Sequence, residues 1–210
     1  VGLKPTYGLV SRYGLTAYGS SLDHISVFAR TVYDSALVLS VIAGHDEKDS
    51  TSLPIEKKDY TASIGKGIKK GLKIGIVQEA INAEGLHAEI REAVITATKQ
   101  YETMGAQIVP ISMKTLEYGA AAYFIVSRAE AASNLGRFDG VRYGLRAPEK
   151  TLIDMYSKTR HDGFGTEVKA RILVGNYVLS VGHAGEFYDN AQRVRRIIRQ
   201  EFVDAFCEVD

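Results

Sequence analysis

Residues 72–112 read "LKIGIVQEAINAEGLHAEIREAVITATKQYETMGAQIVPIS", with two short apolar runs on either side of an amphipathic segment. The runs 72–77 and 107–112 are rich in β-branched residues and bounded by breakers, as buried strands are. Between them, apolar residues recur at the spacing of one helix face: Ile90, Val94, Ala97, Tyr101 and Met104. Gly105 ends that pattern. Strand, helix and strand at this spacing predict a βαβ unit with parallel strands, and so an α/β fold.

A shorter strand and a helix precede this unit. Residues 26–30 read as a strand, and Thr31 follows as a helix N-cap, with Asp34 three residues later. The helix is apolar almost all round from Ala36 to Ala43, which predicts that it is buried rather than half exposed. Gly44 is suited to end it.

After residue 112 the pattern becomes helical. Helices are expected over residues 115–135, 149–161, 165–180 and 183–207. The last of them carries one apolar stripe, formed by Phe187, Ala191, Val194, Ile198, Phe202 and Ala205. We expect one incomplete domain over residues 1–210, with an α/β part over 1–112 and a mainly helical part over 113–210.

Composition and charge narrow the possible functions. The chain has 210 residues, of which 45% are hydrophobic and 24% charged, as in globular proteins. A net charge of +1 gives no general electrostatic reason to bind nucleic acid or an anionic membrane. A single cysteine excludes an internal disulfide framework and suits a reducing cytoplasm. No run is long enough to cross a bilayer and no signal peptide is found, so we expect a cytoplasmic protein.

The N-terminal stretch 2–25, "GLKPTYGLVSRYGLTAYGSSLDHI", fits neither helix nor strand because glycine recurs through it. Such a segment is irregular backbone packed closely against something. Lys4, Ser20 and Ser21 would make a serine–lysine catalytic set if the lysine activated a hydroxyl. The alternative is that Lys4 is exposed or structural and that the two serines close a turn.

Other chemical motifs are missing or weak. The five histidines show no metal-ligand spacing, and no phosphate-binding glycine loop, zinc-protease helix or nucleophile elbow is present. Cys207 is expected to be a packed thiol, and His161–Asp162 a loop pair whose side chains do not meet. The arginine-rich run "QRVRRIIRQ" (192–200) could bind RNA phosphates, or it could be the solvent-exposed face of an amphipathic helix. The second interpretation is favoured.

Several longer blocks are familiar. The N-terminal ones are "GLKPTYG" (2–8), "VSRYGL" (10–15), "SSLD" (20–23) and "ART" (29–31), followed by D-x-A-x-x-L-x-x-I-A-G-H-D. They resemble the amidase-signature family. Later blocks are similar to the glutaminase subunits of tRNA-dependent amidotransferases: "KDSTSL" (48–53), "AEAASNLGRFDGVRYG" (129–144), "GFGTEVKARILVGNYVLS" (163–180) and "AQRVRRIIRQEF" (191–202). The resemblance covers essentially the whole chain.

The resemblance implies a fold and an activity. The implied fold is α/β, part of an amidase-signature fold, with a mixed sheet flanked by helices and a mostly helical second half. The implied activity is hydrolysis of glutamine, whose ammonia passes to a partner subunit that amidates Glu-tRNA(Gln). Subunits B and C of the amidotransferase are the implied partners. ATP and Mg are implied to be used by the partner subunit, and this chain is expected to bind no cofactor or metal.

The family mechanism uses a serine, a cis-serine and a lysine, with backbone N–H groups forming the oxyanion hole. The resemblance places these three residues ahead of Val1, and a proline-rich loop with the closing strands after Asp210. Both ends of the chain therefore look cut. The resemblance implies that this chain has no catalytic residue and is inactive alone. The alternatives for the parent protein are a stand-alone hydrolase of other amides and a non-catalytic structural or assembly fragment.

The resemblance also implies a substrate-binding role for two residues. Arg171 matches the region of a family arginine that pairs with the glutamine α-carboxylate, and a guanidinium fork suits a carboxylate. Tyr123 matches an aromatic position near the same pocket. The alternatives are a surface ion pair for Arg171 and core packing for Tyr123. Asp23 is expected to brace the adjacent turn by accepting backbone N–H groups, with Ser20 and Ser21 as turn residues supporting the site.

Overall fold

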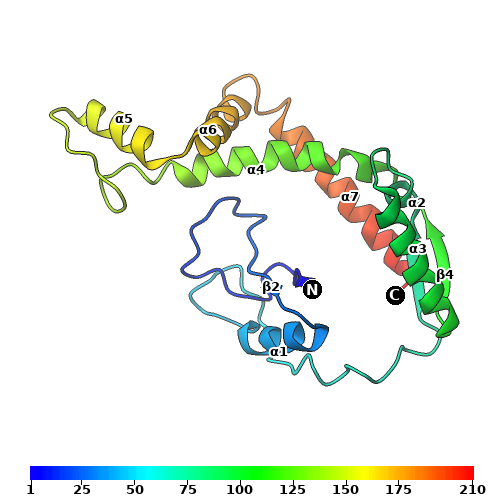
Figure 1. Cartoon of the computed structure of the whole chain (residues 1–210). Helices are drawn as coiled ribbons and strands as arrows, with labels where there is room; N and C mark the ends of the chain where they lie inside the picture. The colour runs from blue at the N-terminus through cyan, green and yellow to red at the C-terminus, as the bar shows by residue number, and fades with distance from the viewer. The chain divides into compact units, whose positions relative to one another are not determined.

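The computed structural model describes residues 1–210, which divide into two compact units (Figure 1). The first unit comprises Val1–Gly65 and Ile125–Ala184, and the second comprises Lys66–Phe124 and Gly185–Asp210. Each unit therefore combines an N-terminal stretch with a more C-terminal one. All strands end before residue 112 and the two longest helices follow it, but the compact units cross that boundary.

The first unit contains a two-stranded sheet and helices. Its elements are β1 (Gly2–Leu3), β2 (Val27–Phe28), α1 (Val32–Ile42), α5 (Leu152–Gly163), α6 (Thr166–Leu179) and the C-terminal part of α4 (Gly119–Leu135). Strands β1 and β2 pair antiparallel, with Gly2 opposite Phe28. An isolated antiparallel bridge joins Val10 to Ala43, so the irregular N-terminal stretch is tied to the end of α1.

Helix α1 begins as the sequence predicts. The Thr31 hydroxyl accepts a hydrogen bond from the Asp34 N–H at 3.0 Å, which satisfies one of the free donors of the first turn. The prediction that α1 is buried is wrong within this chain, because Leu37, Val38 and Val41 are 47%, 42% and 68% exposed. Only one face packs, on an apolar cluster built around Val10, Leu39 and Ala43.

Helices α4 and α6 pack closely because small residues line their contact. Ala131, Leu135 and Ile172 form a buried cluster between them, against which Tyr18 and other partly buried apolar side chains pack. Gly175 of α6 has no room for a side chain, since a Cβ there would lie 2.6 Å from the Cβ of Ala132. The packing of these two helices therefore depends on glycine at this position.

The second unit contains the predicted βαβ segment. Its elements are β3 (Lys73–Val77), α2 (Gln78–Ile81), α3 (Ala88–Thr103), β4 (Gln107–Ile111), the 3₁₀ helix η1 (Lys114–Tyr118), the first part of α4, and α7 (Tyr188–Glu208). Strands β3 and β4 pair in parallel, from Lys73 opposite Gln107 to Val77 opposite Ile111. The parallel pair and the intervening helix α3 are confirmed, with α2 as an unpredicted extra turn.

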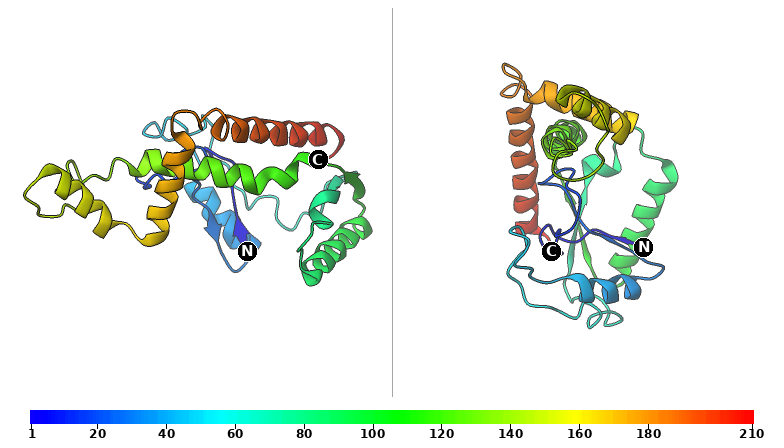
Figure 2. Two further views of the ribbon diagram at one scale, coloured as in Figure 1. Left: turned by 90° about the horizontal axis from the view of Figure 1, so that it is seen from above. Right: turned by 90° about the vertical axis from the view of Figure 1, so that its left-hand side faces the viewer.

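This small sheet lies between two helices, α3 and α7 (Figures 1 and 2). On the α3 side, Val94 of the helix shares an apolar cavity with Ile76 and Ile108 of the strands. On the α7 side, an apolar groove of about 260 Å³ is lined by strand residues together with Phe202 and Phe206. The second unit is thus layered as helix, sheet and helix, as the α/β class requires.

The α/β class is confirmed, but the strands do not form one mixed sheet. The antiparallel pair belongs to the first unit and the parallel pair to the second, as two separate two-stranded sheets. None of the helices is both long and apolar enough to cross a membrane. No group of three His, Cys, Asp or Glu side chains is arranged to hold a metal ion.

Two side-chain predictions are wrong. Cys207 is exposed rather than packed, with its thiol 3.5 Å from the Val203 carbonyl. His161 and Asp162 lie inside helix α5 instead of a loop, and His161 Nδ1 is 2.9 Å from Asp162 Oδ1. Both groups are exposed, and Asp162 also pairs with Lys158 one helical turn away. The pair is therefore a surface arrangement on the helix.

Candidate functional site

The segment Tyr18–Asp23 of the first unit forms a tight turn closed by its own aspartate. Asp23 accepts the N–H of Tyr18 at 2.9 Å through Oδ2 and the N–H of Gly19 at 3.0 Å through Oδ1. The N–H groups of Leu22 and Asp23 both reach the Gly19 carbonyl at 2.8 Å. These bonds satisfy most of the polar backbone of the turn and fix its shape.

Helix α4 holds this turn through two polar side chains. Glu130 accepts the Ser21 N–H at 2.9 Å and the Ser21 hydroxyl at 2.5 Å. Asn134, which is only 5% exposed, donates to the Tyr18 carbonyl at 3.0 Å and shares hydrogen bonds with the Ser20 hydroxyl. A helix carrying buried polar side chains needs such partners, and the turn supplies them.

The structure does not bring Lys4 to either serine. The Lys4 ammonium donates to the carbonyl of Pro5 at 2.7 Å. The Ser20 and Ser21 hydroxyls instead bond Asn134 and Glu130 of α4. In this structure the two serines are turn residues, and Lys4 is not placed to activate them.

The Ser20 carbonyl is held by two further donors. Arg12 Nη1 donates to it at 2.6 Å and the Tyr7 hydroxyl at 2.7 Å. The Arg12 guanidinium lies 5.0 Å from the centre of the Tyr7 ring. Its other donors reach the Thr51 hydroxyl at 3.0 and 3.2 Å. One arginine therefore connects the turn to the loop that contains "KDSTSL".

Asp49 in that loop is ionised at neutral pH. It accepts the Arg12 N–H at 2.8 Å, and Thr51 donates to it from both its hydroxyl, at 2.7 Å, and its N–H, at 2.9 Å. These hydrogen bonds, with a smaller contribution from the Arg12 charge, lower the pKa of the Asp49 carboxyl to about 2. Its side chain is only 8% exposed, so the ionised carboxylate is an internal anchor for the Arg12 segment.

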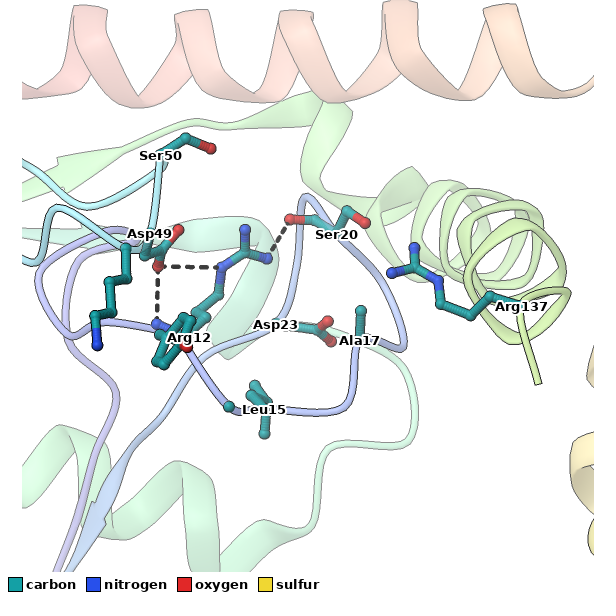
Figure 3. A pocket seen from close by; sticks show the side chains of 11 residues that line it. Arg12, Leu15, Ala17, Ser20, Asp23, Asp49, Ser50 and Arg137 are labelled. Carbon is teal, nitrogen blue, oxygen red and sulfur yellow. Dashed lines mark hydrogen bonds and ion pairs between the residues drawn. The ribbon is translucent and has the colours of Figure 1, made fainter. Parts of the chain in front are cut away.

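These segments line an open pocket of about 310 Å³, drawn in Figure 3. Its wall carries three cationic and two carboxylate side chains: Arg12, Lys48, Arg137, Asp23 and Asp49. Arg137 follows helix α4 and donates to Asn134 at 2.7 Å. Lys48 lies 5.2 Å from the centre of the Tyr13 ring. The pocket is therefore charged and suited to a small polar molecule rather than an apolar one.

Arg171 projects from α6 next to the same turn. Its Nε donates to Glu167 at 2.9 Å, and its Nη1 donates to the Tyr18 hydroxyl at 3.3 Å. The guanidinium carbon lies 5.8 Å from the centre of the Tyr18 ring. The bond to Glu167, followed by that to Tyr18, raises the pKa of Arg171 above its ordinary value, so the group is always cationic. The guanidinium has further N–H donors that these two bonds do not use.

Tyr123, the second substrate-binding candidate, lies on α4 in the second unit. Its side chain is 54% exposed, so within this chain it is not a core residue. Arg171 belongs to the first unit. Ser20, Ser21 and Asp23 also belong to the first unit and meet in the turn that contacts Arg171.

Sequence reasoning missed three residues that organise this region: Arg12, Glu130 and Asn134. Their partners lie far away along the chain, and hydrogen bonds from side chains to loop backbone produce no periodic pattern. One signal was nevertheless present. Helix α4 reads "GAAAYFIVSRAEAASNL", in which a glutamate and an asparagine interrupt a small apolar face. Polar side chains on such a face require partners when they are buried.

Comparison with known proteins assigns the family. The amidase family model matches residues 1–210, the whole chain. The chain therefore belongs to the amidase family, and the resemblance inferred from its motifs is confirmed.

Curated relatives are similar over the full chain. The A subunit of glutamyl-tRNA(Gln) amidotransferase from Rippkaea orientalis is 52% identical over 210 residues, which are 100% of this chain and 43% of the relative. The corresponding protein from Persephonella marina is 53% identical over 211 residues, again covering 43% of the relative. The chain thus spans less than half the length of these relatives.

Solved structures agree with the fold. The crystal structure of the A subunit of glutamyl-tRNA(Gln) amidotransferase from Thermotoga maritima matches 99% of this chain with a TM-score of 0.71 and 31% identity. The match covers 40% of that chain. A bacterial aryl acylamidase of the amidase-signature family also matches with a TM-score of 0.71, but at 21% identity it supports only the shared fold.

Proposed function

We propose that this chain is part of the amidase subunit of a tRNA-dependent amidotransferase, which hydrolyses glutamine to glutamate and ammonia. The observation that carries this proposal is the identity of about half of all residues, over the whole chain, to the A subunits of two glutamyl-tRNA(Gln) amidotransferases. Because the chain spans 43% of those proteins, the activity is proposed for the longer protein.

Within that activity, we propose that Arg171 binds the α-carboxylate of glutamine. Tyr123 is kept as a second substrate-binding residue on the family resemblance alone. The support for Arg171 is chemical. It is cationic at every relevant pH, it is held by Glu167 and Tyr18, and it has further N–H groups for a carboxylate. The turn residues Ser20, Ser21 and Asp23 support this site without reacting.

The ammonia is proposed to pass to a partner subunit that converts Glu-tRNA(Gln) to Gln-tRNA(Gln). Subunits B and C of the amidotransferase are the proposed partners, and ATP with Mg is used by the partner subunit rather than by this chain. The proposed location is the cytoplasm. These assignments come from the names of the relatives and from the amidase-family resemblance.

We also propose that the 210-residue chain has no glutaminase activity by itself. Its best serine candidates, Ser20 and Ser21, bond Asn134 and Glu130, while Lys4 bonds Pro5. No serine–lysine pair is assembled from these residues. Ammonia release from glutamine by the purified chain should equal that of a heat-denatured sample, and release well above it would contradict the proposal.

The substrate is tested on the full-length protein purified with its partner subunits. Ammonia release is measured with glutamine, asparagine and an aryl amide as competing substrates. Preference for glutamine supports the proposal. Equal or faster cleavage of the aryl amide, with glutamine ignored, would favour a stand-alone hydrolase of other amides.

A further inference from the structure

The geometry around Arg171 points to a positioning role for Tyr18. We propose that the Tyr18 ring, held by the turn Tyr18–Asp23, orients the Arg171 guanidinium for a substrate carboxylate. The inference rests on the proposed function, because it assumes that Arg171 contacts the substrate. It adds a residue from the irregular N-terminal stretch to the substrate-binding apparatus on α6.

Two contacts define the orientation of Arg171. Glu167, one helical turn earlier, occupies the Nε edge of the guanidinium at 2.9 Å. Tyr18 lies under the group, with its ring centre 5.8 Å from the guanidinium carbon and its hydroxyl 3.3 Å from Nη1. Both contacts are near the long end of their ranges, and the aromatic face is proposed as the part of Tyr18 that orients the guanidinium. N–H groups on the terminal nitrogens remain to meet a carboxylate.

Tyr18 is itself fixed on three sides. Its N–H donates to Asp23 at 2.9 Å and its carbonyl accepts from Asn134 at 3.0 Å. Its side chain packs on the buried cluster formed by Ala131, Leu135 and Ile172. The backbone of Tyr18 is thus held by hydrogen bonds, and its packed ring gives the Arg171 guanidinium a supported surface.

This arrangement reduces the side-chain entropy that Arg171 loses when a substrate carboxylate binds. A free arginine side chain samples many rotamers, and that freedom is lost when a carboxylate binds. A guanidinium already placed on a fixed aromatic ring has lost part of it before the substrate arrives. The effect acts on substrate binding, so it should appear in KM and leave kcat nearly unchanged.

The test uses the intact amidotransferase with its partner subunits and measures kcat and KM for glutamine. Tyr18→Leu removes the aromatic face while keeping apolar volume on the cluster below. It should raise KM roughly fivefold, the size expected for a lost cation–π contact, with kcat within about a factor of two. Tyr18→Phe keeps the face and should restore KM to within about twofold of the original protein. Tyr33→Leu, at a 52% exposed tyrosine on α1, is the matched control and should leave both constants unchanged.

Arg171→Gln in the same assay separates the two proposals. If it raises KM by a large factor and Tyr18→Leu does not, the positioning role of Tyr18 is wrong while the role of Arg171 stands. If Arg171→Gln leaves KM unchanged, the proposed substrate contact itself fails, and this inference fails with it. Thermal unfolding of each variant shows whether a kinetic change reflects loss of folded protein. A Tyr18→Leu protein whose only defect is a lower unfolding temperature would also contradict the positioning role.

Discussion

Gly175 on α6 packs directly against the backbone carbonyl of Arg128 on α4. A Cβ atom on Gly175 would overlap that carbonyl oxygen and stand 2.6 Å from the Cβ of Ala132. Backbone cannot move aside as the end of a flexible side chain can, so the two helices would have to separate. Because Glu130 and Asn134 on α4 hold the turn Tyr18–Asp23, this helix contact also supports the candidate site.

The first prediction concerns this contact. Gly175→Ala should destabilise the protein by about 2 to 3 kcal/mol, since overpacking a close contact outweighs the better helix propensity of alanine. Gly119→Ala is the control, because a Cβ at Gly119 would meet only Ile198 at an ordinary 3.8 Å. Thermal or urea unfolding of the two variants gives the comparison. Equal stability of both would show that the helices do not depend on this glycine.

The second prediction concerns Glu130. Glu130→Ala removes the acceptor of both the Ser21 N–H and the Ser21 hydroxyl. It should cost about 1 to 3 kcal/mol, the usual penalty for removing the acceptor of such hydrogen bonds. Hydrogen exchange should rise in the turn Tyr18–Asp23. Glu92→Ala, at an exposed glutamate of α3, should change neither quantity. Unchanged exchange in the turn of the Glu130 variant would refute the anchoring role.

The third prediction concerns pH. The folded-state pKa of Asp49 lies below its ordinary value, so ionised Asp49 stabilises the protein above about pH 4. That contribution is lost as the pH falls through about 2. Asp49→Asn should therefore be less stable than the original protein at neutral pH. The difference should shrink as the pH falls from about 4 towards 2.

Asp59→Asn provides the matched control for Asp49. Asp59 makes the same pair of bonds with Thr61, from its N–H at 2.9 Å and its hydroxyl at 2.6 Å, but has no bond from Arg12. Its variant should show a smaller stability loss. Unfolding temperatures measured between pH 2 and pH 7 test both variants. A pH-independent loss in Asp49→Asn would mean that the carboxylate charge is not what anchors the loop.

Local patterns predicted much of the fold. The βαβ unit followed from apolar spacing, and the parallel pairing of β3 with β4 confirms it. The start of α1 followed from Thr31, whose hydroxyl caps the helix as expected. The burial of α1 could not be predicted in this way. A helix that is apolar all round is suited to burial, but the pattern does not say whether this chain supplies the surface that buries it. Here Val41 of α1 is 68% exposed.

The candidate site was predicted less well. Motif resemblance led to Arg171, Tyr123 and the turn residues, but their roles remain predictions. The links that organise the region join residues far apart in sequence, as Arg12 is joined to Thr51 and Ser21 to Glu130. Such contacts depend on tertiary packing and carry no spacing signal. From sequence, Asp49 and Thr51 indicate only a local aspartate–threonine turn. Nothing in the sequence indicates that the Arg12 N–H also donates a hydrogen bond to Asp49.

The most direct measurement is glutamine-dependent amidation of tRNA by the full-length protein with the proposed partner subunits B and C. Glu-tRNA(Gln), ATP, Mg and glutamine are supplied, and the aminoacyl group on the tRNA is identified after the reaction. We predict conversion to Gln-tRNA(Gln) that requires glutamine and falls sharply in Arg171→Gln, with activity recovered when free ammonia replaces glutamine. Glu-tRNA(Gln) left unchanged by an assembled complex that still cleaves unrelated amides would contradict the proposed function.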